Sequence, residues 1–280
     1  MTDKRTDRTP PLVGGSGSGL TSDAGHNQGM TTEAMARHIA HEHGRSPFSD
    51  NLKEIVYGGL DGIITTFAVV SGFSGAALLG AGGNGEAYAI TLVLLFGLAN
   101  LLADGVSMGL GDFLSTRSEQ ARWNRERAVE IHEIAHNPDQ EYEETVHLLE
   151  EQGLSADDAR TVADVYRRYP GLWADWMMEH ELQMEDMSTA TPAKDGFVTF
   201  TSFLVFGVIP LLPYLAFWGR DISSDALFAL ASSATVIALL ALGLARSIVT
   251  RENHWRAMLE VLGVGVIAAS IAFGVGVLLG

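Results

Sequence analysis

The stretch AYAITLVLLFGLANLLADGVSMGLGDFLS, residues 87–115, decides the fold of this 280-residue chain. A helix that crosses the hydrocarbon core of a bilayer needs about 20 mostly apolar residues, and this stretch exceeds that length. Its only charged residues are Asp104 and Asp112. No proline follows before Pro138, so we expect one continuous helix that leaves the membrane and extends into water until Asn137 and Pro138 stop it.

Four other stretches are equally apolar and long enough to span a membrane: residues 55–80, 196–219, 225–246 and 258–280. A soluble protein is excluded, because helices that are apolar all round must be covered by lipid or by a far larger polar shell. We therefore predict an all-α membrane protein with five transmembrane helices. Pro210 and Pro213 should break the third span, since proline cannot donate a backbone hydrogen bond.

The segment between spans two and three is polar and strongly acidic. Residues 119–186 hold 18 of the 34 acidic residues, against six Arg and no Lys. Helices are expected at 139–152, from Ser155 onward, and at 172–186, with Gly153 ending the first of them. We therefore divide the chain into a disordered N-terminal tail (1–47), transmembrane helices 1–2 (48–117), an inserted cytoplasmic helical metal-binding domain (118–190), and transmembrane helices 3–5 (191–280).

The overall charge and the absence of cysteine exclude several classes of function. The net charge of −16 argues against binding to nucleic acid, and the lack of Cys excludes disulfides and thiolate metal sites. About 50 polar residues precede the first span, so we expect no cleavable signal peptide. An acidic chain of this kind suits a protein that handles cations.

Lys and Arg beside the spans predict the orientation, because cytoplasmic loops are enriched in them. They gather before span one, after span two and between spans four and five: Arg45, Lys53, Arg117, Arg122, Arg125, Arg127, Arg246, Arg251 and Arg256. The loop between spans three and four has only Arg220. The N-terminus and the acidic domain are therefore predicted to be cytoplasmic.

Two spans carry carboxylates, which are costly in lipid and therefore indicate a functional site. Asp61 lies inside span one, although an Asp near a helix end could also reach headgroup water. On span two, one gently winding face carries a side chain at every fourth residue: Asn100, Asp104, Met108 and Asp112. A Met between carboxylates favours a metal path over simple packing, and we predict Asp61, Asp104 and Met108 as metal ligands.

The acidic domain has three helical faces with carboxylates three or four residues apart, one of them mixed with methionine. Their members are Glu126, Glu130, Glu133; Glu141, Glu144; and Met177, Glu181, Met184, with Met178 beside the last face. Like charges so spaced repel, and a cation between them would reverse the repulsion. Oxygen ligands combined with thioethers favour Fe²⁺ and its transition-metal neighbours over Mg²⁺ or Ca²⁺.

Two other functions fit parts of this pattern. Glu133 with His136, and Glu144 with His147, form Glu-x-x-His motifs like those of ferritin-like di-iron proteins, so a membrane-tethered di-iron ferroxidase is one alternative. A metal sensor that gates a partner is another, although Asp61 and Met108 inside the bilayer argue against it. We expect no enzyme activity and no prosthetic group, with the metal as substrate.

Five motifs resemble the vacuolar iron transporter family, in order and in spacing. They are GLDG at 59–62, SMGL at 107–110, STRSE at 115–119, WMMEHE at 176–181 and IPLLPY at 209–214. The resemblance covers about residues 48–280. It implies five transmembrane helices per subunit, a homodimer, and exchange of Fe²⁺ or similar divalent ions for protons.

The resemblance also implies roles for individual residues. The family's intramembrane aspartate and methionine fall on Asp61 and Met108. Its cytoplasmic metal ligands fall on Glu130, Glu133, Glu141, Glu144, Glu181, Met177 and Met178. Some members carry a second intramembrane carboxylate where this chain has Asn100, and Asp104, one turn further on, is predicted to replace it.

Together these features predict a proton-coupled exporter of Fe²⁺, and of Mn²⁺ or related divalent metals, out of the cytosol. The polar, glycine-rich start of the chain favours a bacterial inner membrane over a vacuolar membrane. The expected partners are the lipid bilayer, divalent metal ions, protons and a second copy of the chain.

Overall fold

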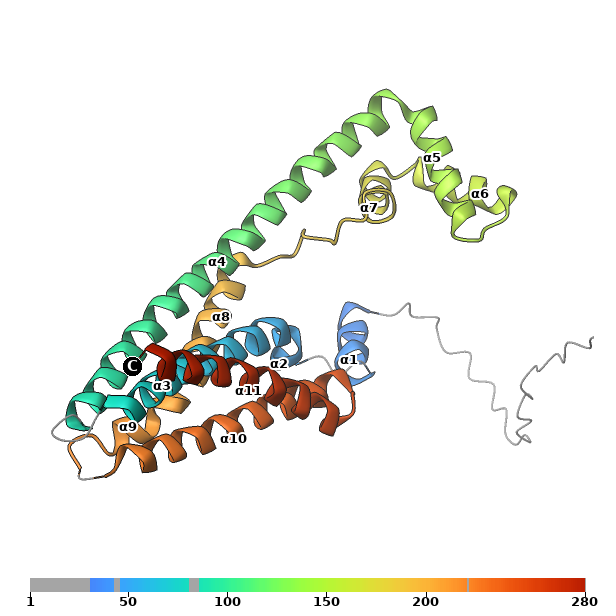
Figure 1. Ribbon diagram of the computed structural model, residues 1–280. Helices are drawn as coiled ribbons and strands as arrows, with labels where there is room; N and C mark the ends of the chain where they lie inside the picture. The colour runs from blue at the N-terminus through green and yellow to red at the C-terminus, as the bar shows by residue number, and fades with distance from the viewer. Residues whose placement is uncertain (1–30, 43–45, 81–85, 221, 280) are drawn as a thin grey trace, which may run out of the picture. The chain divides into compact units, whose positions relative to one another are not determined.

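The computed structural model describes residues 31–42, 46–80, 86–220 and 222–279, and all regular elements in these ranges are helical (Figure 1). Five of these helices are long and apolar enough to cross a membrane. The prediction of an all-α membrane protein with five spans is thereby confirmed.

The chain forms two compact units, residues 1–45 and residues 46–280. The first unit contains α1 (Thr32–Glu42), where we had predicted a disordered tail over 1–47. The structure differs there because Thr31 Oγ1 accepts a hydrogen bond from Ala34 N–H at 3.1 Å and so caps a run of good helix formers. Residues 1–30 and 43–45, which the same prediction covers, lie outside the described residues.

The second unit begins with a short helix, α2 (Pro47–Asp50), which Ser46 caps. It continues into the first span, α3 (Leu52–Gly80), which packs against α8 (Pro192–Gly207). At the contact, a Cβ on Gly62 would collide with the Phe203 carbonyl oxygen, so only glycine allows the two backbones to approach this closely. Asp61 therefore lies on a helix whose backbone packs closely against that of α8.

The second span is the first part of α4 (Glu86–His136), an unbroken helix of 51 residues. At 1.5 Å per residue it is roughly 76 Å long, whereas the hydrocarbon core of a bilayer is only about 30 Å thick. The charged second half of α4 therefore lies outside the membrane. The predicted continuous helix is confirmed, and it ends one residue before Asn137.

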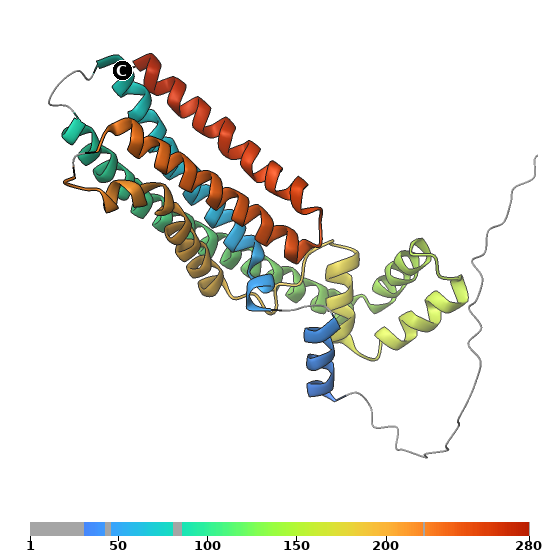
Figure 2. The same cartoon turned by 90° about the horizontal axis from the view of Figure 1, so that it is seen from below.

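The third span is interrupted, as its two prolines predict. α8 ends at Gly207 and is followed by a 3-10 turn, η1 (Ile209–Leu211), and by the short helix α9 (Leu212–Ala216). The last two spans, α10 (Ser224–Thr250) and α11 (His254–Leu279), form a hairpin. Figure 2 shows α11 and α3 side by side, in agreement with their extensive contact.

Between the second and third spans lie α5 (Pro138–Glu151), α6 (Ala156–Tyr166) and α7 (Pro170–His180). Gly153 adopts φ 101° and Ser155 caps α6, as expected. The last helix differs from the predicted 172–186. It begins at Pro170, since proline is well suited to the first helical position, and it ends at His180, where Gln183 at φ 52° turns the chain away.

Candidate metal centre

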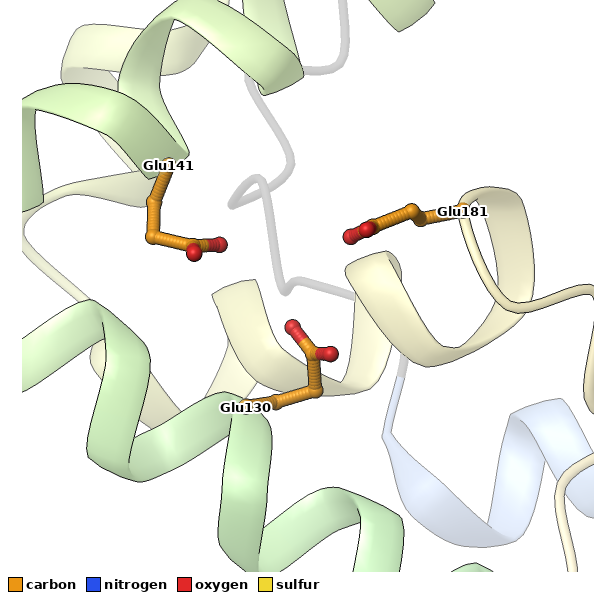
Figure 3. Close-up of side chains that lie close together, drawn as sticks. All are labelled: Glu130, Glu141 and Glu181. Atoms are coloured by element: carbon orange, nitrogen blue, oxygen red, sulfur yellow. The ribbon is translucent and has the colours of Figure 1, made fainter. Parts of the chain in front are cut away.

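Three glutamates from three parts of the acidic segment point toward one another. Glu130 comes from α4, Glu141 from α5, and Glu181 from the residue that follows α7 (Figure 3). One carboxylate oxygen from each lies within 4.8 Å of the others. Since divalent cations bind oxygen ligands at about 2.0–2.6 Å, a small contraction would let all three oxygens share one ion.

The turn between α4 and α5 explains why two of these residues meet. α4 ends at His136, and Pro138, at the first position of α5, starts the next helix at once. Glu130 and Glu141 therefore lie near the same helix junction, on facing helices.

Packing of α7 brings the third glutamate to the site. Trp173, Ala174 and Met177 of α7 form a buried apolar cluster with Ile134 of α4. This cluster positions the C-terminal end of α7, where Glu181 begins the segment that leads back to the membrane. The third carboxylate is thus placed by an apolar core that contains neither of the other two glutamates.

A buried hydroxyl connects this core to the backbone of the site. Thr145 Oγ1 accepts a hydrogen bond from the Trp173 Nε1–H at 2.7 Å and donates to the Glu141 carbonyl oxygen at 2.7 Å. The bond from Trp173 joins α7 to α5, and the bond to Glu141 lies within α5 and orients the hydroxyl. Sequence reasoning missed Thr145 and Trp173, because neither is a ligand type and 28 residues separate them.

Two of the three carboxylates are buried without compensation. Glu130 and Glu141 are each only 3% exposed. The Oε2 atom of each has no hydrogen-bond partner among the described residues. A buried, unpartnered carboxylate oxygen is costly, and a bound cation would offset that cost at both oxygens.

Electrostatics support this interpretation. Burial, reinforced by the negative charges of Glu181 and Glu141, raises the pKa of Glu130 to about 7. Burial and the charges of Glu144 and Glu181 likewise raise the pKa of Glu141 to about 7. The pKa of Glu181 is also raised, mainly by burial of its carboxylate. Protons and metal ions would therefore compete for the same oxygens near neutral pH.

The other predicted glutamates lie around the three. Glu133 and Glu144 are half-buried, and their charges contribute to the raised pKa of Glu130. Glu144 accepts a hydrogen bond from Gln140 Nε2 at 3.0 Å. Glu126, which shares their helical face in the sequence pattern, instead pairs with Arg125. Five of the six acidic residues in the predicted faces thus act on one site.

The predicted methionine ligands have a different environment from the glutamates. Met177 and Met178 are buried, at 0% and 1% exposed. Met177 belongs to the apolar cluster with Trp173, and its Sδ lies 3.4 Å from Thr145 Oγ1. Met177 therefore packs the core beside the site, and its role as a ligand stays a prediction, as does that of Met178.

The histidines of the two Glu-x-x-His motifs are exposed and interact elsewhere. His136 Nδ1 lies 2.8 Å from the His132 carbonyl oxygen, and its ring stacks on that of His132. His147 Nε2 faces Glu151 on its own helix at 3.5 Å. A di-iron centre needs both histidines beside the glutamates, so this geometry argues against the ferroxidase alternative.

Inside the membrane, the predicted polar stripe of α4 meets α3. Asp104 Oδ2 accepts a hydrogen bond from Asn100 Nδ2 at 2.7 Å. Asp61 lies on α3, which contacts α4 along the spans. That Asp104 replaces the carboxylate missing at Asn100 stays a prediction.

The other two members of the stripe contact apolar and hydroxyl groups. Met108 packs at the edge of the apolar cluster that includes Phe203. Asp112 Oδ2 accepts a hydrogen bond from Thr199 Oγ1 of α8 at 2.6 Å. Sequence reasoning missed Thr199, since 87 residues separate it from Asp112 and an isolated Thr carries no signal.

The chain resembles known proteins over most of its length. It matches the VIT family over residues 52–277. It is 33% identical over 261 residues to "Vacuolar iron transporter" of Toxoplasma gondii (strain ATCC 50861 / VEG), covering 91% of this chain and 82% of the relative. It is 29% identical over 249 residues to "Vacuolar iron transporter 1" of Oryza sativa subsp. japonica, covering 88% and 92%. A third relative, "Vacuolar iron transporter" of Plasmodium falciparum (isolate 3D7), is 33% identical over 239 residues, 82% of each chain. These relatives are named as transporters, not as enzymes.

Proposed function

The chain belongs to the VIT family, and from this membership and its glutamate cluster we propose that it exports Fe²⁺ from the cytosol in exchange for protons. Mn²⁺ and related divalent transition metals would use the same path, because shared oxygen and thioether ligands bind all of them. The metal is the substrate of the protein.

The observation that carries the proposal is the convergence of Glu130, Glu141 and Glu181 outside the membrane. Two of the three are buried, and each of those two has an unpartnered oxygen. At high pH, where these carboxylates are deprotonated, a bound divalent cation would lower the free energy of the site by offsetting their mutual repulsion. Glu133, Glu144, Met177 and Met178 would complete the ligand set or tune its charge.

The proposed path follows α4 from the cluster into the membrane. The same unbroken helix carries Glu130, Met108 about six turns earlier, and Asp104 about seven turns earlier. Asp61 lies on α3, which contacts α4, so in this proposal an ion on the path would meet carboxylates from both helices. In our proposal Asp61, Asp104 and Met108 form the intramembrane site.

Proton coupling would follow from the same carboxylates. A carboxylate must lose its proton before it binds metal, so metal entering a protonated site releases protons. In the proposed cycle the intramembrane carboxylates carry the metal outward and return protonated. The affinity for the metal then depends on the pH on each side of the membrane.

We further propose that the N-terminus and the metal-binding domain are cytoplasmic, that the membrane is a bacterial inner membrane, and that the protein is a homodimer.

An apolar cavity of about 850 Å³ between α3, α4 and α11 supports the dimer. It is lined mainly by small residues, which favour close helix approach in a bilayer. Asn100 is also in this lining, so a second subunit there would lie next to the intramembrane carboxylates.

A flux measurement tests the proposal. The full chain is reconstituted in liposomes with a pH gradient, Fe²⁺ or Mn²⁺ is added outside, and internal metal and internal pH are recorded together. We expect metal uptake coupled to an opposite proton movement. Asp61→Ala should abolish the flux, while the exposed Asp225→Ala should not.

The outcomes separate the alternatives. Full flux in Asp61→Ala would refute the proposed path. Tight metal binding with no flux in the wild-type protein would favour a metal sensor. Oxidation of Fe²⁺ that depends on His136 and His147 would favour the ferroxidase.

A further inference from the structure

A second apolar groove lies between α4 and α8, away from the stripe that carries Asp104 and Asp112. Its volume is about 420 Å³. Its lining is entirely apolar and consists of Val106, Gly109, Leu110, Phe113, Ala193, Gly196, Phe197 and Phe200. These residues belong to the end of the second span and the start of the third, so the groove lies in the leaflet nearer to the glutamate cluster.

The groove exists because the two helices meet at glycines. A Cβ on Gly109 would lie 2.8 Å from the Gly196 carbonyl oxygen and 2.7 Å from Phe200 Cβ. The backbones of α4 and α8 are thus in contact, and the larger side chains on either side form the walls. Phe197 and Leu110 remain 64% and 57% exposed, so the walls open toward the surrounding lipid.

Two basic side chains, with two carboxylates beside them, lie at the end of the groove nearer to the soluble helices. The Arg117 guanidinium lies 5.9 Å from the centre of the Phe113 ring, which is part of the groove wall. Lys194 is exposed and follows directly after Ala193. The neighbouring carboxylates of Glu119 and Asp195 accept hydrogen bonds from Ser115 and Thr191, respectively. The mouth therefore offers two cationic side chains at the level of lipid headgroups.

We propose that this groove binds one acyl chain of an anionic phospholipid, whose phosphate contacts Arg117 and Lys194. Basic side chains at the headgroup level of a membrane protein attract anionic lipids, and an apolar groove that opens to lipid accommodates a hydrocarbon chain. The bound lipid would brace α4 against α8 beside the hydrogen bond between Asp112 and Thr199.

Charge argues against a second copy of the chain as the occupant. A two-fold interface brings the same patch of both subunits together, which would set the two copies of Arg117 and Lys194 against each other. The cavity between α3, α4 and α11 has no basic residue in its lining, and it suits a second subunit better.

Native mass spectrometry and thermal unfolding of the full chain in detergent test the proposal. Dioleoyl phosphatidylglycerol and dioleoyl phosphatidylcholine are compared, since they share acyl chains and differ in headgroup charge. We expect the anionic lipid to be retained and to raise Tm by about 2–4 °C more than the zwitterionic one. The double variant Arg117→Gln/Lys194→Gln should lose this preference, and Val106→Trp, which fills the groove, should lose retention of both lipids.

Arg220→Gln is the matched control. Arg220 also lies over an aromatic ring, that of Phe217, at 5.7 Å, but Phe217 is not part of this groove. Equal effects of the two lipids on the wild type, or an anionic preference that survives in the double variant, would overturn the proposal. So would efficient disulfide-linked dimers of Leu110→Cys, which is a clean probe because the chain has no other cysteine.

Discussion

The carboxylates outside the membrane and those inside it are arranged in opposite ways. Glu130 and Glu141 each have a buried oxygen without a hydrogen-bond partner among the described residues. Asp104 and Asp112, within the bilayer, each accept a short hydrogen bond, from Asn100 and Thr199 respectively.

The difference follows from the two solvents. Outside the membrane, the raised pKa values of Glu130 and Glu141 let these carboxylates hold protons near neutral pH. Lipid offers neither water nor counterions, so hydrogen bonds from protein donors such as those to Asp104 and Asp112 offset the cost of a carboxylate there. In the proposed transport cycle, the soluble cluster would capture an ion and the intramembrane carboxylates would pass it on.

After the complete loss of flux expected for Asp61→Ala, the largest effect is expected for Asp104. Asp104→Ala removes one of two neighbouring intramembrane carboxylates and leaves Asn100 without its acceptor. We expect flux in liposomes to fall by roughly 100-fold, since loss of a charged hydrogen-bonding group costs about 1.5–3 kcal/mol or more. Metal binding by the glutamate cluster, measured by calorimetry, should not change. A parallel loss of binding would show that the two sites are not separable.

The next effect concerns the soluble site. Glu130→Gln/Glu141→Gln should weaken Mn²⁺ binding by at least roughly 100-fold, because even partners of metal ligands contribute 10–100-fold. The same variant should be more stable than the wild type without metal at pH 8, since two buried charges are removed. Calorimetry and thermal unfolding in chelator measure the two properties. The exposed Glu150→Gln on α5 is the control, and a less stable double variant would contradict the idea of an unsatisfied site.

A smaller, graded effect is expected from pH. The pKa of Glu130 and of Glu141 rises from 4.5 to about 7 on folding, so the folded protein binds more protons than the unfolded chain between these values. Without metal, the contribution of these two groups to the free energy of unfolding should therefore be greatest below pH 4.5. It should fall as the pH rises to 7.

Metal affinity should change in the opposite direction. It should rise with pH through 7, by roughly tenfold per pH unit for each proton displaced. Titrations from pH 5.5 to 8 measure it, with Glu130→Gln/Glu141→Gln as the variant in which the slope disappears. A pH-independent affinity in the wild type would show that the cluster is not protonated when empty.

The smallest effect is expected for the histidines. His136→Ala/His147→Ala should leave metal affinity and flux within twofold of the wild type, and should change stability by less than about 0.5 kcal/mol, because both side chains are exposed. The same flux and binding assays apply. A large loss of binding would restore the di-iron alternative and remove the contrast between the two carboxylate sites.

Much of this arrangement could be predicted from the sequence. Apolar length predicts the five spans, the absence of proline predicts the continuity of α4, and Pro210 with Pro213 predicts the break after α8. Helical spacing also selects Glu130, Glu133, Glu141, Glu144 and Glu181 as candidates. It could not separate Glu126 from them, because spacing defines a helical face and says nothing about which charged neighbour that face meets.

The sequence by itself determined where the chain crosses the membrane and which side chains lie on each helix face, because both depend on local length and periodicity. Only the tertiary structure decided that Glu181 joins Glu130 and Glu141, that Thr199 supports Asp112, and that Met177 packs into a core. These outcomes depend on contacts between helices far apart in the chain, where packing of apolar surfaces such as that around Trp173 sets the geometry.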